Sequence, residues 1–308
     1  TEDKFGIEKR IREEMSEITG DAYWSSDVKC LTLEHAMAAR RGKFDQFFLP
    51  LSEISSLRDS VLSGESKTLR FLTNELIPIS NALISGLDFE VMRLLKKYSP
   101  LFLDGEVTLG QVNAVSLACE KLKVLVSDNA NSILDIIECV IDENILECPE
   151  ILKSIVIVKR ELGGFEEEEG DKKIDVASAW ARALMSSMEQ LGNYIKYLND
   201  ELNFGTHQGV KGLEFERVMA VIDDAEAKGF LFGYEKFFGA EGFTARDVEN
   251  IKAGKDSSPD RTRRLFYVIC SRAERSLVLV NYTSDRNSVR EKMLEKNWFS
   301  DSEIIIYD

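Results

Sequence analysis

The chain has 308 residues, of which 44% are apolar, with 5 prolines and a formal net charge of -15. This composition is typical of a globular protein and excludes a disordered chain. The negative charge argues against a protein that coats phosphate backbones over its whole surface, although a local groove can still be basic. The length allows two domains, or one domain with a large insertion.

The five cysteines are widely spaced and include no CxxC pair, so the sequence predicts neither a zinc site nor a disulfide framework. They are typical of reduced thiols in the cytoplasm. The sequence contains no apolar run long enough to span a membrane, and its N-terminus lacks the pattern of a signal peptide. We therefore expect a cytoplasmic protein without a membrane partner.

The first forty residues predict helix, strand and helix. Apolar residues recur at helical spacing over residues 1–20, where Gly20 is a plausible end. Residues 28–33 are short, apolar and bounded by polar residues, which predicts a strand. Residues 36–41 then favour a helix.

From about residue 44 to residue 202 the pattern is almost wholly helical. One long apolar stripe runs from Val176 to Leu198 at helical spacing, and its Trp and Met residues are interpreted as core packing. Residues 163–173 are expected to form an exposed loop.

After residue 202 the pattern changes to that of a βαβ unit. The continuous apolar runs at 218–222 and 276–281 predict strands buried in a parallel sheet, and residues 260–271 predict the helix between them. Residues 229–255 are interpreted as an irregular excursion. Two further elements are expected near the end of the chain: a helix at 287–296 and an edge strand at 304–307.

The predicted strands thus lie at 28–33 and beyond 203, on either side of a helical block. A single parallel sheet interrupted by a large helical insertion explains this order. Two domains in series would leave the strand at 28–33 without a sheet.

The segment GTHQGVKGLEF, residues 205–215, places glycines and polar residues directly before a buried strand. Gly209 and Gly212 allow close backbone approach to a ligand and unusual dihedral angles. Exposed N–H groups in such a loop suit phosphate oxygens, Lys211 adds a positive charge, and Glu214 is an acceptor suited to a sugar hydroxyl. Composition alone leaves open a capped loop without a ligand.

The segment RTRRLFYVICSRA, residues 261–273, predicts a helix with one apolar face against a sheet. Arg264 and Arg272 are eight residues apart and so lie on similar faces. The planar guanidinium of an arginine at the end of a buried helix suits a polyphosphate, as an arginine finger does. Taken alone, Arg272 could equally be a surface arginine paired with an acid such as Glu274.

Together, the two segments resemble motifs V and VI of the UvrD/Rep/PcrA group of superfamily 1 DNA helicases. GTHQGVKGLEFERVMAV is similar to motif V, in which Thr and His precede Lys-Gly-Leu-Glu-Phe. RRLFYVICSRAERSLVLV is similar to motif VI, with Arg-Arg-Leu-x-Tyr-Val and then Ser-Arg-Ala, where Ser replaces the commoner Thr. The resemblance covers residues 203–282 closely and residues 28–45 only loosely.

The resemblance implies two RecA-like domains with ATP bound between them, each carrying a helical insertion. The implied fold is therefore α/β, with residues 1–44 and 203–308 forming the second RecA-like domain and residues 45–202 an all-helical insertion. The implied function is the C-terminal motor domain of an ATP-dependent DNA helicase or translocase that moves 3′ to 5′.

The resemblance also implies roles for single residues. By its place in motif VI, Arg272 is the catalytic residue that reaches the γ-phosphate of ATP from across the cleft. Glu214 and Gly212 bind the nucleotide, and Arg264 braces the motif VI helix or the nucleotide cleft. The residues implied to contact single-stranded DNA are Thr206, His207 and Lys211.

The sequence departs from the family pattern at the phosphate loop, because G-x-x-x-x-G-K-[ST] does not occur. Gly254 and Lys255 come nearest, but the first glycine and the following Ser or Thr are missing. The motif IV arginine is not found either. Asp223 and Asp224 resemble the end of a Walker B strand, but without a phosphate loop we do not expect them to bind a metal.

We therefore expect this chain to be a C-terminal fragment or one half of a split enzyme. The phosphate loop and the ligands of the Mg²⁺ that accompanies ATP would lie on an N-terminal helicase domain, so this chain alone should not hydrolyse ATP. The other expected partner is single-stranded or partly duplex DNA.

Two alternatives stay open at this point. The chain could be a non-catalytic protein-interaction module derived from a helicase, with the acidic helical block binding a protein partner. It could instead be the helicase subunit of a nuclease-linked recombination or phage-defence system, although no cluster of nuclease carboxylates is present.

Overall fold

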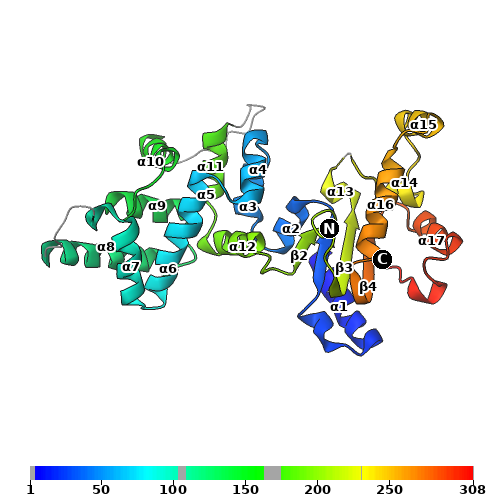
Figure 1. The fold of residues 1–308 in the computed structure, drawn as a ribbon, viewed down its shortest axis with the longest axis horizontal. Coiled ribbons are helices and arrows are strands. Elements are labelled where there is room, and N and C mark those ends of the chain that lie inside the picture. Colours follow the sequence, from blue (N-terminus) through cyan, green and yellow to red (C-terminus); the bar gives the residue numbers. More distant parts are fainter. Residues whose placement is uncertain (1–3, 103–108, 163–174, 230, 308) are drawn as a thin grey trace. The chain divides into compact units, whose positions relative to one another are not determined.

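The structure, a computed structural model, describes residues 4–102, 109–162, 175–229 and 231–307 (Figure 1). The chain divides into two compact units. Thr1–Arg41 and Asn203–Asp308 form one, here named the sheet unit, and Gly42–Leu202 form the other, the helical unit. The loop expected at 163–173 lies outside the described residues.

The sheet unit is built on one parallel sheet. Its four strands in the described part of the chain run in the order β2–β1–β3–β4, and all neighbours are parallel. This confirms the predicted α/β class and the predicted sheet between the start of the chain and the residues beyond 203. The strands are β1 (Lys29–Thr32), β2 (Phe204–Thr206), β3 (Phe215–Asp223) and β4 (Ala273–Tyr282).

The central strands are apolar because helices cover both faces of the sheet. All residues of β3 from Arg217 to Asp223 are buried, as are the last three residues of β1. β2 was not predicted: it has only three residues, one of them Gly205, and carries no apolar pattern. It forms because β1 offers it a free edge, with Leu31 opposite Gly205.

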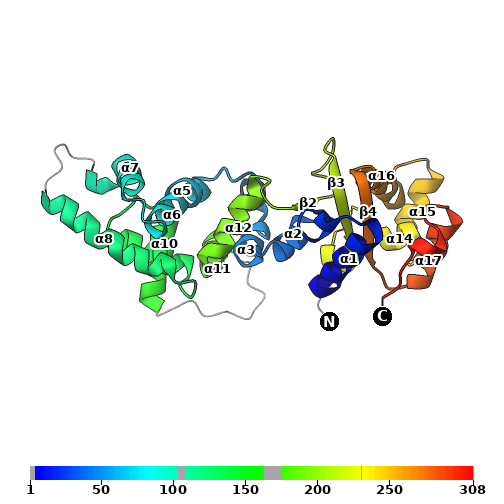
Figure 2. The same ribbon diagram turned by 90° about the horizontal axis from the view of Figure 1, so that it is seen from below.

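Helix α1 (Lys4–Thr19) packs on one face of the sheet and helix α16 (Ser258–Cys270) on the other (Figure 2). On the α1 face the Tyr282 hydroxyl donates to the carbonyl oxygen of Lys4 at 3.2 Å. On the opposite face, an aromatic cluster joins α16 to α14 (Tyr234–Phe238) and to the segment after α17 (Arg286–Glu295). Its rings belong to Tyr234, Phe237, Phe238, Phe266 and Trp298.

Two predictions for the C-terminal part of the sheet unit are wrong. Residues 229–255, interpreted as irregular, contain α14 and α15 (Ala245–Lys252), because Thr244 and Asp247 form a capping box that starts a helix. Residues 304–307 are not an edge strand. Tyr307 instead packs on α1, where Arg10 lies over its ring at 4.5 Å. The remaining elements of this unit are α2 (His35–Arg41), α13 (Asp224–Ala227) and the 3-10 turns Ala22–Ser25 and Asp301–Glu303.

In the helical unit every regular element that the structure describes is a helix, apart from an isolated bridge between Ser132 and Ser187. The stripe predicted from Val176 to Leu198 is split into two helices, because the chain turns between Met185 and Ser187. The helices are α3 (Asp45–Ser52), α4 (Ser55–Ser63), α5 (Lys67–Phe71), α6 (Ile77–Ile84), α7 (Asp88–Tyr98), α8 (Leu109–Ser127), α9 (Ile133–Asp142), α10 (Glu150–Leu162), α11 (Val176–Leu184) and α12 (Met188–Leu198), with a π-helical turn at Leu72–Leu76 and a 3-10 turn at Pro100–Phe102.

An aromatic core holds the first and last helices of the helical unit together. Phe47 of α3 packs against Trp180 of α11 and Tyr194 of α12, with ring centroids 6.4 and 5.1 Å apart. The buried Tyr194 hydroxyl donates to the carbonyl oxygen of Val61 at 2.6 Å, so its polar end is satisfied. The interpretation of Trp180 as core packing is confirmed.

A buried ion network joins three helices of the sheet unit. The Arg41 side chain is 2% exposed, and its guanidinium donates to Glu8 of α1 at 2.7 Å and to Glu226 of α13 at 3.2 Å. It also donates to the carbonyl oxygen of Met37 at 3.1 Å. One guanidinium therefore pairs with one buried and one partly buried carboxylate, on elements that are far apart in sequence.

We predict that Arg41→Ala lowers the free energy of unfolding by about 3–5 kcal/mol, because it removes the ion pair of the buried Glu8 carboxylate and leaves Glu226 paired only with the more exposed Arg40. Arg40→Ala is the matched control. Arg40 pairs with the same Glu226 but is 36% exposed, so its loss should cost less than about 1 kcal/mol. Chemical denaturation of both variants measures the difference, and equal losses would contradict the proposed role of Arg41.

Candidate functional site

The end of α16 and the loop before β3 meet at one edge of the sheet. Arg272 lies two residues after the end of α16, and its Nη1 donates to the carbonyl oxygen of Leu213 at 2.8 Å. Its own carbonyl oxygen accepts from the N–H of Phe215, also at 2.8 Å. The two segments that the sequence singled out are therefore bonded to each other, by both the side chain and the backbone of Arg272.

Hydrogen bonds fix the guanidinium of Arg272 but engage only some of its N–H groups. Its Nε donates to the carbonyl oxygen of Val268 at 2.9 Å and its Nη2 to the hydroxyl of Ser271 at 2.9 Å. Three of its five N–H groups are engaged, and the side chain is partly exposed. The acid suggested as an alternative partner, Glu274, forms no ion pair with Arg272 among the described residues. A fixed arginine with two free donors at the surface suits an anionic ligand.

The loop from residue 207 to residue 214 owes its course to two glycines. The N–H of Gly209 donates to the Thr206 hydroxyl at 3.1 Å, and a Cβ added at Gly209 would lie 2.9 Å from that oxygen. Only glycine fits this turn without a shift. Gly212 has a φ of +79°, a conformation that favours glycine, although a Cβ added there would meet no atom within 4 Å.

Several site residues face solvent on this loop. Lys211, Gly212, Leu213 and Glu214 are all exposed. Neither the Lys211 ammonium nor the Glu214 carboxylate has a hydrogen-bond partner within the described part of the chain. The loop thus presents one free cation, one free acceptor and the backbone around Gly212 next to Arg272.

Thr206 and His207, predicted to contact DNA, lie inside the fold instead. Thr206 is 7% exposed and uses its hydroxyl to cap the turn, while His207 is fully buried. The His207 ring lies between Leu31 and Tyr234: Nε2 is 3.3 Å from the Leu31 carbonyl oxygen and Nδ1 is 3.4 Å from the Tyr234 hydroxyl. A DNA phosphate cannot reach this ring in the described arrangement, so the structure gives His207 a packing role.

Gln208, which the sequence reasoning missed, is the exposed polar side chain at this turn. It lies in the turn after β2, and the two residues before it, Thr206 and His207, are both buried, so the alternation of a strand gives no signal for its exposure.

The structure shows no contact between the side chains of Arg264 and Arg272. Its Nη2 donates to Asp256 at 2.7 Å, and the side chain is 60% exposed. The acid lies just before α16, so Arg264 supports the start of that helix. The prediction that it braces the nucleotide cleft gains no contact from the structure.

The comparisons with known proteins leave the function to be argued from this geometry. No protein-family model matches the sequence, and no curated protein matches it either.

The remaining candidate residues have structural roles. Asp223 is buried, caps α13 by accepting from the N–H of Glu226 at 2.9 Å, and pairs with Lys4. Burial raises the pKa of Asp224, which accepts from the N–H of Glu235 at 2.9 Å. The described residues contain no group of three or more His, Cys, Asp or Glu side chains placed to hold a metal ion.

Gly254 and Lys255, the nearest match to a phosphate loop, end a helix rather than begin one. Gly254 has a φ of +64°, and the N–H of Lys255 donates to the carbonyl oxygen of Asn250 at 2.8 Å. This is a helix C-terminal motif with glycine in the left-handed conformation.

Among the described helices, none is long and apolar enough to cross a membrane.

The buried histidine predicts a pH-dependent stability. The Leu31 carbonyl can only accept, so Nε2 carries the proton and the Tyr234 hydroxyl donates to Nδ1. Burial lowers the pKa of His207 to about 4, despite the opposing hydrogen bond to Leu31. The unfolded state, with its pKa near 6.5, therefore binds more protons between these two values, and stability falls as the pH falls through that window.

We predict that lowering the pH from 7.5 to 5 costs the wild type about 2 kcal/mol through His207, and that His207→Gln removes this part of the loss. Thermal unfolding followed by circular dichroism at the two pH values measures it. Burial also lowers the pKa of His35, the other histidine of the chain, so the pH dependence that remains in His207→Gln is compared with that of the double variant His207→Gln/His35→Gln. An unchanged pH dependence in His207→Gln would contradict the assignment.

Proposed function

We propose that this chain is the second, RecA-like motor domain of an ATP-dependent DNA helicase similar to the UvrD/Rep/PcrA group, with the helical unit as its insertion. The observation that carries the proposal is the bond between Arg272 and the Leu213 carbonyl oxygen. It joins the two segments that resemble motifs V and VI, and both leave polar groups exposed at one edge of a parallel sheet.

The nucleotide contacts proposed for this edge follow from the groups that are free. The two unused N–H groups of Arg272 reach the γ-phosphate of ATP, and the Glu214 carboxylate accepts from a ribose hydroxyl beside Gly212. Because three bonds already orient the guanidinium, little reorganisation is needed when phosphate charge develops. A phosphate-loop domain outside this chain supplies the other half of the site and binds the Mg²⁺ that accompanies ATP.

The DNA contacts proposed for the same loop differ from those expected from the sequence. Lys211 is exposed and offers its charge to the backbone of single-stranded DNA, and Gln208 offers an amide. Thr206 and His207 support them from inside by fixing the turn. ATP-driven closure of the two motor domains would move the strand past this loop.

We predict that Arg272→Lys lowers DNA-stimulated ATP turnover about 10³-fold in the protein that contains both motor domains, because lysine keeps the charge but lacks the planar fork. DNA binding should stay within about twofold. Arg275→Ala is the control: Arg275 is an exposed arginine three residues further along, 3.8 Å from Glu216. Steady-state ATPase assays and DNA anisotropy measure both quantities.

Turnover unchanged by Arg272→Lys would contradict the proposal and favour a non-catalytic interaction module. DNA-stimulated ATP hydrolysis by this chain alone would also contradict it, because the phosphate loop is proposed to lie elsewhere. Equal losses in ATPase and in DNA binding would indicate that Arg272 only maintains the fold of the loop.

We predict that Lys211→Ala weakens single-stranded DNA binding about three- to tenfold and lowers the salt dependence by about one ion, as expected for one lost phosphate contact. Fluorescence anisotropy with a labelled oligonucleotide at several salt concentrations measures this. Lys9→Ala, at an exposed lysine of α1, should change neither quantity. A Lys211→Ala variant that binds like the wild type would exclude this loop as a DNA contact.

A further inference from the structure

Helix α15 presents its apolar side chains to solvent and buries an acid. Asp247 is its only buried residue, whereas Val248 is 37% exposed, Ile251 46% and the preceding Phe243 51%. An amphipathic helix that only serves the fold shows the opposite arrangement. The exposed side of α15 is therefore not explained by packing in this chain.

Asp247 attaches this helix to the sheet unit by polar contacts. Its carboxylate accepts from the Thr244 hydroxyl at 2.6 Å and from the N–H of Ser258, the first residue of α16, at 3.2 Å. Lys236 lies 3.6 Å away, and together these partners lower the pKa of Asp247, with the Thr244 hydrogen bond as the largest cause. The negative charge of Asp247 is thus already neutralised inside the fold.

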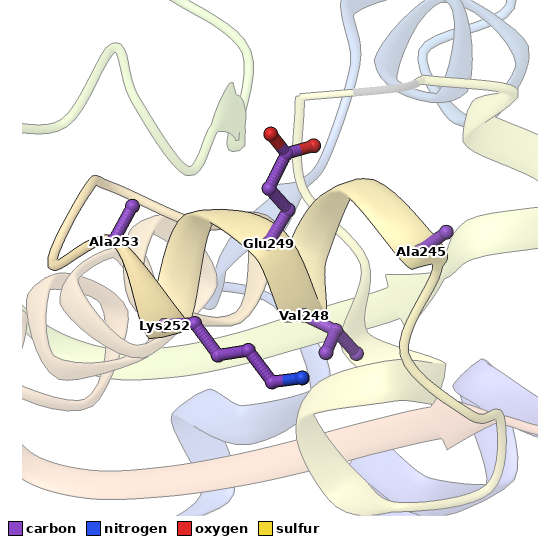
Figure 3. Close-up of a pocket in the computed structure, with 5 residues that line it drawn as sticks. All are labelled: Ala245, Val248, Glu249, Lys252 and Ala253. Atoms are coloured by element: carbon purple, nitrogen blue, oxygen red, sulfur yellow. The ribbon is translucent and has the colours of Figure 1, made fainter.

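Two of the other acids near α15 are engaged and two are not. Asp256 pairs with Arg264 at 2.7 Å, and Asp260 accepts from the Ser257 hydroxyl at 2.6 Å. Glu241 and Glu249 are exposed and have no ion-pair partner among the described residues. Glu249 also lines the hollow beside Val248 and Lys252, although its side chain projects to the side opposite to Lys252 (Figure 3). The three cations on and directly after this helix still outnumber these two free acids.

Those cations are Arg246, Lys252 and Lys255, all exposed. None has an ion-pair partner within the part of the chain that the structure describes. Val248 and Lys252 project together on one side of the helix, in a shallow hollow that the short side chains of Ala245 and Ala253 leave open (Figure 3). In a chain with a net charge of -15, this local excess of positive charge points to an anionic ligand.

From this arrangement we infer that α15 binds the sugar–phosphate backbone of DNA. Free lysine ammonium groups attract phosphates, and the methyl groups of Val248 beside Lys252 suit the apolar face of a deoxyribose. The negative surface elsewhere repels DNA, so that the contact is confined to this helix.

This contact is separate from the loop at Lys211. Asp247 accepts from the first residue of α16, whereas Arg272 lies two residues after the last. A helix of 13 residues is about 20 Å long. The inference extends the proposed function by a second DNA contact at the other end of α16. It is tested on this chain alone and does not require ATP hydrolysis.

The test reverses two charges at the end of α15, in the variant Lys252→Glu/Lys255→Glu. Binding of a fluorescein-labelled oligonucleotide, as a single strand and as a duplex, is measured by anisotropy at several salt concentrations. We expect the affinity to fall at least tenfold and the salt dependence to fall by about two ions. The form of DNA that loses more affinity is the one that α15 binds.

The matched control is Lys96→Glu/Lys97→Glu. These two exposed lysines also lie at the end of a helix, α7, so the change in net charge and in the interaction with the helix dipole is the same. The control should bind DNA with an affinity within about threefold of the wild type. Circular dichroism of both variants checks that the fold is kept.

Each outcome decides one question. Equal losses in both variants would overturn the inference, because net charge alone would account for them. Full DNA affinity in Lys252→Glu/Lys255→Glu would overturn the inference as well. In that case, weaker DNA binding by Lys211→Ala would still support the proposed function. If the wild-type chain bound anionic lipid vesicles through Lys252 and Lys255 but did not bind DNA, a membrane contact would replace the inference.

Discussion

The pairing of β3 with β4 at their first residues is the constraint on which the candidate site depends. The N–H of Phe215 donates to the carbonyl oxygen of Arg272, and the Arg272 guanidinium returns a bond to Leu213, so each segment fixes the other. Eight register pairs continue this contact along the two strands. Because parallel strands begin at the same edge of a sheet, a loop before one strand and a helix end before the next must meet there. The exposed groups of residues 211–214 are positioned by this pairing and not by contacts of their own.

Buried polar groups hold the opposite edge of the sheet, where the strands β1, β2 and β3 end. His207 joins the end of β2 to α14 through Tyr234, and Arg41 joins α1, α2 and α13 through two carboxylates. In both places the partners are complete, so that a change at one member leaves another without its bond. Lys211, Glu214 and Lys252, which have no side-chain partner in the described part of the chain, lie instead at the surface. Asn281 of β4 differs from both groups, because its buried amide has no hydrogen-bond partner there.

The sequence predicted best the elements that have a long apolar pattern, either a continuous run or a stripe at helical spacing. The buried run of β3, the helix α16 and the strand β4 were all predicted, because a continuous apolar run or a long helical stripe is compatible with few structures. β2 was missed because three residues carry no periodicity. α15 was missed although Val248 and Ile251 recur at helical spacing after a capping box, because a helix of only 8 residues was read as part of a longer irregular segment. Burial of His207 depended on Tyr234, 27 residues away, and no local pattern could show it.

The position of β1 has a consequence for the order in which the chain acquires its structure. Cys30 pairs with Phe204 and with Met219, so the first strand has no neighbour until more than 170 further residues have left the ribosome. Closing so long a loop is slow even where its entropy cost grows only gently with length. During synthesis the edges of β1 stay open to other chains, and its four-residue length limits how well they can pair there. A short first strand is therefore a protection against misassembly on the ribosome.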